Sequence, residues 1–252
     1  MFNYGDRKIM KKTCLFGLPI NITSMEEAIE TLLNAKKPMQ VVTINPEMVD
    51  KAQENNEIAD LIKNADVVVP DGIGVVMALR LVGIKTNRIP GIELSHNLLK
   101  IAEERNLKAA MIGADEDTIQ TAKNELLKEF PNLNIAYLRN GYFNNCEEEE
   151  ILKELENIQP DILLAGLGFP KQEQFIANFK KLSKCSIMIG VGGSFDVWSK
   201  KVKRAPMIFQ KLNLEWFYRL LCQPSRFNRV FPTIPLFLFK VPLKHKLHRK
   251  EY

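Results

Sequence analysis

Cysteine and histidine are scarce in this sequence, which limits the chemistry that it can support. Its four cysteines lie far apart and lack the Cys-x-x-Cys spacing of zinc or redox sites. Of its three histidines, only His96 precedes residue 200, and we interpret it as structural. We therefore expect no disulfide framework, no metal site and no Cys-His or Ser-His-Asp mechanism, and the cysteine pattern fits a reducing cytoplasm.

Long apolar runs are missing as well. No stretch reaches the length of a transmembrane helix, and residues 1–12 lack the apolar segment of a signal peptide. With 46% hydrophobic and 26% charged residues, the composition is typical of a globular protein. A chain of 252 residues accommodates one large domain, or one domain with an appendage.

Charge divides the chain into two parts. Of its 35 basic and 30 acidic residues, residues 201–252 hold 12 and 2, which leaves 23 and 28 for residues 1–200. Phenylalanines interleave with these basic residues, and such a segment suits an anionic surface, either a lipid membrane or a nucleic acid. We predict a core over residues 1–200 and a mainly helical, membrane-binding appendage over residues 201–252.

Strand and helix patterns alternate along the core. Strands are expected at Thr13–Ile20, Gln40–Ile44, Val67–Val69, Ala109–Ile112, Asn134–Leu138, Asp161–Ala165 and Ser186–Val191. Helices are expected at Met25–Lys36, Ile92–Arg105, Glu116–Phe130, Glu147–Ile158 and Lys171–Leu182. This alternation predicts an α/β fold with a mostly parallel, Rossmann-like sheet and helices on both faces.

Asp71 stands where one of these strands ends. Val67–Val69 is a β-branched apolar run, Pro70-Asp71-Gly72 indicates a sharp turn, and a helical pattern follows through Leu81. Ligands of open α/β sheets bind at the carboxyl ends of strands, so Asp71 is a candidate site residue. The alternative is that its carboxylate caps the following helix.

Three further strand ends carry polar or glycine-rich segments, namely Thr43–Glu47, Gly166–Glu173 and Gly190–Asp196. Taken alone, each also fits a structural turn, such as an Asx turn before Pro46. Their convergence on one sheet edge favours a ligand site. A dinucleotide fold is not supported, because Met77 occupies the third glycine position after Gly72-x-Gly74.

Together these motifs resemble the WecG/TagA/CpsF family of glycosyltransferases, and most closely its TagA branch. The resemblance covers about residues 13–200, and the basic segment matches the appendage of the family. The matching motifs are Thr43–Glu47, Pro70–Gly74 with Arg88–Gly91, Gly113-Ala114, Gly141–Phe143, Gly168–Glu173 and Gly192–Asp196.

The resemblance implies an inverting enzyme at the cytoplasmic membrane face, with no cofactor or metal. Family members transfer an N-acetylhexosamine from a UDP-sugar to polyprenyl-diphosphate-linked N-acetylglucosamine, and the TagA branch uses UDP-N-acetylmannosamine for the linkage unit of wall teichoic acid. The sequence leaves open which sugar is donated, among N-acetylmannosamine, its uronic acid and glucose, and whether the chain forms homo-oligomers.

A different functional class also stays open. A non-catalytic nucleotide- or RNA-binding module would grip phosphates with the basic segment. The many Phe and Leu residues beside the charges fit an interfacial membrane anchor better, so we expect no nucleic-acid partner.

The resemblance also implies residue roles. Asp71 matches the general base, Arg88 would compensate diphosphate charge, and Thr43, Asn45 and Gln172 would position the sugars. Tyr142 and Asp196 would hold the uridine, and Gly113 and Gly193 lie in the matching substrate-binding turns. Because Arg88 is essentially the only arginine in the core motifs, we predict that Arg219, Arg226 or Arg229 of the appendage reaches the leaving diphosphate.

Overall fold

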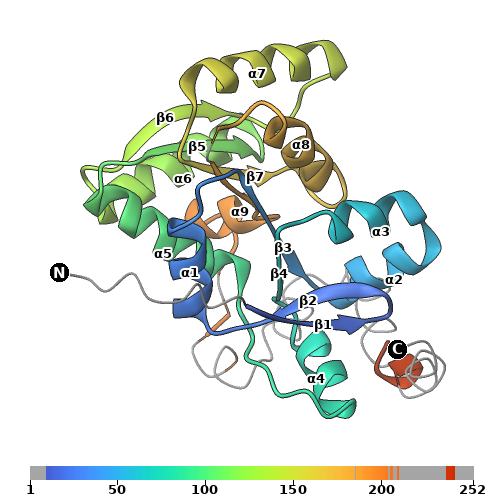
Figure 1. The fold of residues 1–252 in the computed structure, drawn as a ribbon. Helices are drawn as coiled ribbons and strands as arrows, with labels where there is room; N and C mark the ends of the chain where they lie inside the picture. Colours follow the sequence, from blue (N-terminus) through green and yellow to red (C-terminus); the bar gives the residue numbers. More distant parts are fainter. Residues whose placement is uncertain (1–9, 185, 204, 207–208, 210–236, 242–252) are drawn as a thin grey trace.

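The computed structural model describes residues 10–184, 186–203, 205–206, 209 and 237–241, and its architecture is α/β (Figure 1). A six-stranded sheet with the order β4-β3-β8-β7-β5-β6 forms its centre, and all of its strand pairs are parallel. The strands are β3 (Met39–Ile44), β4 (Val67–Pro70), β5 (Lys108–Gly113), β6 (Asn134–Arg139), β7 (Ile162–Gly166) and β8 (Ile187–Gly190). Each lies within one residue of its predicted bounds, and the predicted parallel sheet is confirmed.

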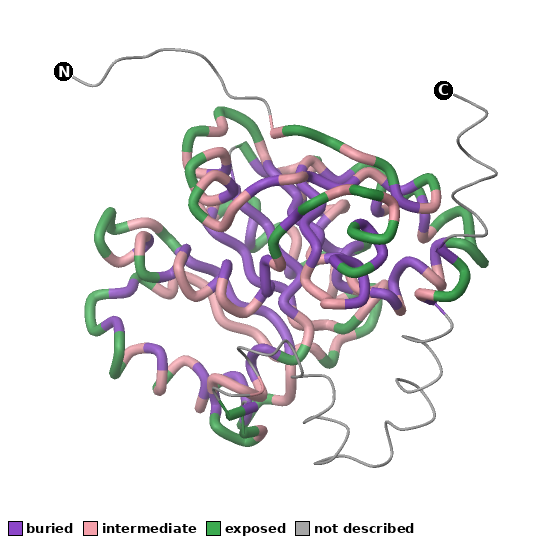
Figure 2. The backbone as a smooth tube through the Cα atoms, turned by 90° about the horizontal axis from the view of Figure 1, so that it is seen from below, coloured by how far each residue is buried: buried purple, intermediate pink, exposed green. Residues whose placement is uncertain are grey.

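Side chains of successive strand residues point to opposite faces of the sheet. Val41 and Val67 pack on one face, whereas Val42 and Val68 pack on the other. Helices bury both faces, which explains why the strands are apolar runs without polar alternation. The buried backbone accordingly runs through the interior of the molecule, with exposed segments at its periphery (Figure 2).

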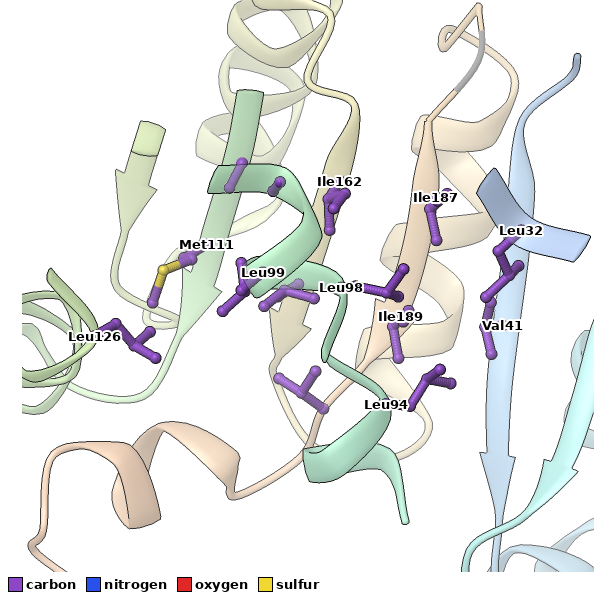
Figure 3. Close-up of a cluster of buried hydrophobic side chains, with 14 of the residues drawn as sticks. Leu32, Val41, Leu94, Leu98, Leu99, Met111, Leu126, Ile162, Ile187 and Ile189 are labelled. Carbon is purple, nitrogen blue, oxygen red and sulfur yellow. The ribbon is translucent and has the colours of Figure 1, made fainter. Parts of the chain in front are cut away.

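The described residues form helices α1–α9, most of which cover the sheet, and a further helical segment at residues 237–241. Helices α1, α5 and α6 pack on one face, where their leucines meet the strands (Figure 3), and α3, α7 and α8 lie on the opposite face. The helices are α1 (Met25–Leu33), α2 (Pro46–Glu54), α3 (Asn56–Lys63), α4 (Ile73–Leu81), α5 (Gly91–Glu104), α6 (Glu116–Glu129), α7 (Asn145–Ile158), α8 (Lys171–Lys180) and α9 (Ser194–Trp198). None of them is long and apolar enough to cross a membrane.

The prediction of a single strand over Thr13–Ile20 is wrong. An antiparallel hairpin of β1 (Lys11–Leu15) and β2 (Leu18–Ile22) replaces it, because the chain reverses at Phe16 and Gly17, both with positive φ. The hairpin lies against β4, where the Asn21 side-chain oxygen accepts the Val68 N–H at 2.8 Å. This contact satisfies a backbone donor of a strand at the edge of the sheet.

A short part of the predicted appendage is described, and it packs on the core. Residues 237–241 are helical, and Phe237 and Val241 are buried in the cluster that the hairpin shares with α2, α3 and α4. The Phe237 ring meets the Phe16 ring edge-on, with 5.6 Å between centroids, and Lys240 pairs with Asp50 at 3.0 Å. The predicted helical structure of the remaining appendage lies outside the described residues and stays a prediction.

Candidate active site

The predicted site residues lie at one edge of the sheet, at the carboxyl ends of its six parallel strands. This is the edge at which open α/β sheets bind ligands. Across the sheet, the strand ends carry Asp71 after β4, Thr43 and Asn45 at β3, Gly193 after β8, Gly168 and Gln172 after β7, Gly113 at β5 and Tyr142 after β6.

Asp71 is held by the loop that leads into α5. Its Oδ1 accepts the N–H of Gly91 at 3.2 Å and lies 3.8 Å from Nη2 of Arg88, whose Nε–H donates to the Asp71 carbonyl oxygen. The side chain of Asp71 is 32% exposed. The carboxylate is therefore fixed at the start of α5 and beside a guanidinium, and both stabilise its negative charge.

Asp71 is not the N-cap residue of the helix that follows it. Helix α4 has Gly72 at its N-cap and no side-chain hydrogen bond there. The carboxylate instead accepts from the first residue of α5, twenty positions along the chain. Asp71 thus joins two segments at the sheet edge.

Two glycines bring neighbouring polar residues against this loop. A Cβ on Gly91 would lie 2.9 Å from Oγ1 of Thr43, and one on Gly72 would lie 2.9 Å from Cδ of Pro46 and 3.3 Å from Cβ of Asn45. Real Cβ atoms rarely approach so closely, so glycine at both positions permits the contact. Thr43, Asn45, Asp71 and Arg88 therefore form one cluster, as the sequence predicted.

Asn45 has the capping role that was one of its two predicted alternatives, and its ligand-binding role stays a prediction. Its Oδ1 accepts the N–H of Met48 at 3.0 Å and caps α2, as expected for a turn before Pro46. No hydrogen bond of its amide nitrogen occurs within the described part of the chain. The amide N–H groups are therefore what Asn45 offers to a ligand.

Gln172 connects the next strand ends to this cluster. Its Oε1 accepts the N–H of Gly192 at 3.1 Å, and its Nε2 donates to Oε1 of Glu173 at 2.9 Å. A Cβ on Gly190 would lie 2.3 Å from Nε2 of Gln172, so only glycine fits there. Since Oγ1 of Thr43 lies 3.5 Å from the Gly190 carbonyl oxygen, Gln172 belongs to the same region as Asp71.

Glu173 is the residue that the sequence-based assignment missed. It is 1% exposed, and burial raises its pKa to about 7, although hydrogen bonds from Gln172 and from its own backbone oppose the shift. A signal was present in the sequence. Gln172 precedes Phe175, Ile176 and Phe179 with the spacing of a buried helix face, which places the adjoining Glu173 close to the core.

Replacing Glu173 by glutamine should change how stability depends on pH. The folded chain keeps a proton on Glu173 that the unfolded chain releases above its ordinary pKa of 4.5. The free energy of unfolding therefore falls between pH 4.5 and about 7 and then levels off, by up to about 3 kcal/mol. Glu173→Gln removes this decline, which urea unfolding at pH 5 and pH 8 measures.

The matched control is Glu150→Gln, the same chemical change at an exposed position of α7. It should reproduce the pH dependence of the wild type. An equal decline in Glu173→Gln and wild type would contradict the raised pKa of Glu173.

The far half of the edge is built from close backbone contacts. A Cβ on Gly113, whose φ is 146°, would lie 2.5 Å from the Gly166 carbonyl oxygen, and one on Gly141 would lie 3.0 Å from Cα of Gly113. Beyond them, Tyr142 is 77% exposed. Since β5 lies four strand positions from β4, Gly113 and Asp71 are separated by roughly 19 Å. The structure thus places Gly113 and the neighbouring Tyr142 segment apart from Asp71, whereas Asp196 follows β8, two strand positions from β4.

Asp196 and Lys201 follow β8 in the chain, where the core meets the predicted appendage. Asp196 is partly exposed in α9, and its Oδ2 would lie 3.4 Å from a Cβ on Gly193. Lys201 donates to Asp115 and to Thr118, both at 2.9 Å, and lowers the pKa of the Asp115 carboxyl. The first residue of the predicted appendage is therefore tied to the end of β5. Arg219, Arg226 and Arg229 lie outside the described residues.

An Asp-x-Asp pair, Asp115 and Asp117, occurs at the start of α6. Asp115 caps this helix through the Thr118 N–H and binds Lys201. In the ranges that the structure describes, no three His, Cys, Asp or Glu side chains are grouped to hold a metal ion.

Comparison with known proteins identifies the family. The family model described as "Glycosyl transferase WecG/TagA/CpsF family" matches residues 13–252. The chain is 36% identical over 242 residues to proteins from Staphylococcus aureus strains NCTC 8325 / PS 47, COL and MRSA252, with 94% of each chain covered. These relatives are named N-acetylglucosaminyldiphosphoundecaprenol N-acetyl-beta-D-mannosaminyltransferase.

Proposed function

This chain belongs to the WecG/TagA/CpsF family of glycosyl transferases, and on that premise we propose that it transfers N-acetylmannosamine to undecaprenyl-diphosphate-linked N-acetylglucosamine. The names of the relatives state this sugar and this acceptor, and their similarity extends over 94% of the chain. The proposed donor is UDP-N-acetylmannosamine, and the proposed product is the linkage unit of wall teichoic acid.

The proposed reaction is a single inverting displacement. The oxygen of the acceptor hydroxyl attacks the anomeric carbon of the donor sugar, the bond from that carbon to the diphosphate breaks, and UDP leaves. The hydroxyl proton passes to the carboxylate of Asp71. The observation that carries this assignment is the partly exposed Asp71 carboxylate, fixed at the end of β4 by Gly91 and Arg88.

The surrounding residues supply binding in this proposal. Arg88 contacts Asp71 through its backbone and its carboxylate, and the charge of its guanidinium would offset that of the donor diphosphate. Thr43 and Asn45 adjoin Asp71 and would bind sugar hydroxyls, with Gln172 behind them. Tyr142 and Asp196 would hold the uridine, and Gly113 and Gly193 would lie in substrate-binding turns.

The acceptor is a membrane lipid, and this sets the proposed location. Residues 201–252, with their 12 basic and 2 acidic residues, would hold the enzyme peripherally on the anionic cytoplasmic face of the membrane. Family membership does not favour the alternative of a non-catalytic RNA-binding module.

A donor panel tests the proposal. With a lipid-diphosphate-linked N-acetylglucosamine acceptor, kcat/KM for UDP-N-acetylmannosamine should exceed that for UDP-glucose by about 100-fold or more, because unpaired polar groups penalise the wrong sugar. UDP-N-acetylmannosaminuronic acid is the third donor to compare. UDP release should require the acceptor, and EDTA should leave the rate unchanged. A higher kcat/KM for either other donor would replace the proposed substrate, and restoration of an EDTA-inhibited rate by Mg²⁺ would contradict the metal-free mechanism.

A further inference from the structure

Glu173 is a buried carboxyl group that the proposed displacement does not use. It lies in the first turn of α8 and is 1% exposed. Its Oε1 accepts from Gln172, and its Oε2 has no hydrogen-bond partner among the described residues. An ionised carboxylate in this setting would be a buried charge stabilised only by the hydrogen bonds from Gln172 and from its own backbone, which is unfavourable.

No described cation compensates such a charge. Helix α8 packs against β3, β7, β8, α3 and α7, and the three strands contain no ionisable residue. Several charged groups on the helices have other partners: Lys63 pairs with Asp60, Lys180 with Asp66, and Glu148 with Asn178, while Lys171 lies over the Phe143 ring. The surroundings of Glu173 therefore favour the neutral acid.

The amide of Gln172 has one satisfied orientation because of Glu173. When its Oε1 accepts the Gly192 N–H, its Nε2 faces Oε1 of Glu173 and donates to it. In the reversed orientation, the Gln172 Oε1 would face Oε1 of Glu173, and its Nε2 would face the Gly192 N–H. The absence of a Cβ on Gly190 lets the pair lie directly against β8. Glu173 therefore determines how Gln172 supports the loop after β8.

We propose that Glu173 is a positioning residue whose neutral carboxylic acid holds Gln172, and through it the Gly190–Gly193 loop, in the geometry that binds substrate. This inference rests on the proposed transferase function. It means that protonation of Glu173 controls substrate binding at this site. Loss of the proton leaves a buried charge that no described cation compensates and whose Oε2 has no described partner, so the Glu173 side chain moves toward water, its contact with Gln172 is lost, and substrate binding weakens.

The inference predicts a decline of kcat/KM as pH rises through about 7, the pKa of Glu173, in addition to any acidic limb from the base Asp71. Glu173→Gln keeps a neutral group with an acceptor oxygen, so it should retain activity at pH 6.5 and lose the alkaline decline.

Glu173→Leu removes the acceptor, and kcat/KM at pH 6.5 should fall about 10-fold, mainly through KM, as expected for one lost hydrogen bond. Glu150→Gln, on the exposed face of α7, should keep the wild-type profile.

A readout independent of activity uses the Gly192 amide. In ¹⁵N-labelled wild-type protein without substrate, its resonance should titrate with a midpoint near pH 7, and Glu173→Gln should abolish this titration. A Gly192 resonance that titrates equally in Glu173→Gln, or an unchanged alkaline decline in that variant, would overturn the inference. If instead no donor sugar is transferred while Gly192 titrates as stated, the proposed function fails and the coupling of Glu173 to the loop stands.

Discussion

Replacing Asp71 by asparagine should reduce kcat by roughly 10²- to 10⁴-fold, the usual cost of removing a general base. The asparagine oxygen can still accept the Gly91 N–H that Oδ1 of Asp71 accepts at 3.2 Å, so the turn between β4 and α5 should persist. The neutral amide cannot take the proton of the acceptor hydroxyl. Initial rates of transfer, calorimetric titration with UDP and urea unfolding of the same variant measure the three quantities, and UDP affinity should change little.

The control for this variant is Asp60→Asn, the same change at an exposed position of α3 that pairs with Lys63. It should leave kcat and UDP affinity unaltered. If Asp71 were only a cap for α5, Asp71→Asn would keep both its stability, because asparagine caps helices about as well as aspartate, and its activity. Full activity in that variant would therefore refute the assignment of Asp71 as the base.

The parallel sheet was predictable because its strands are short apolar runs between turn residues. Val67–Val69 followed by Pro-Asp-Gly predicts a short buried strand that ends in a turn. Helices between successive strands are typical of parallel pairing, which the structure has. The N-terminal hairpin was not predictable in the same way. Two five-residue strands that meet at Phe16-Gly17 carry the apolar content of one longer strand, and only their packing against β4 distinguishes the two arrangements.

The position of the candidate site followed from the same pattern, but the partners of its residues did not. Placing Thr43, Asp71 and Gln172 at strand ends puts them on one edge of the sheet. The hydrogen bond from the Gly91 N–H to the Asp71 carboxylate, by contrast, depends on the path of the loop between α4 and α5. The neutral state of Glu173 depends on burial, which is rare for a glutamate, so its residue type alone predicts the opposite.

The described cations at this edge of the sheet already have contacts within the protein. Arg88 contacts Asp71, Lys171 lies over the Phe143 ring, Arg139 pairs with Glu147, and Lys201 is bound to Asp115 and Thr118. A departing UDP carries at least two negative charges, and its stabilisation usually requires cationic groups at the diphosphate. The appendage arginines Arg219, Arg226 and Arg229 are the proposed source. Truncation of the appendage is a poor test, because it also removes Phe237 and Val241 from a hydrophobic cluster of the core.

Two triple variants separate anchoring from catalysis. Arg219→Ala/Arg226→Ala/Arg229→Ala and Lys244→Ala/Lys246→Ala/Lys250→Ala each remove three positive charges from the appendage. Binding to anionic liposomes should weaken equally in both, by about 1 kcal/mol per charge. Transfer to a water-soluble, short-chain acceptor should fall by roughly 10²- to 10³-fold in the arginine variant alone, the cost of losing a group that stabilises transition-state charge. Sedimentation with liposomes and initial rates without membranes measure the two effects. Equal rates for both variants on the soluble acceptor would show that the appendage acts as an anchor only.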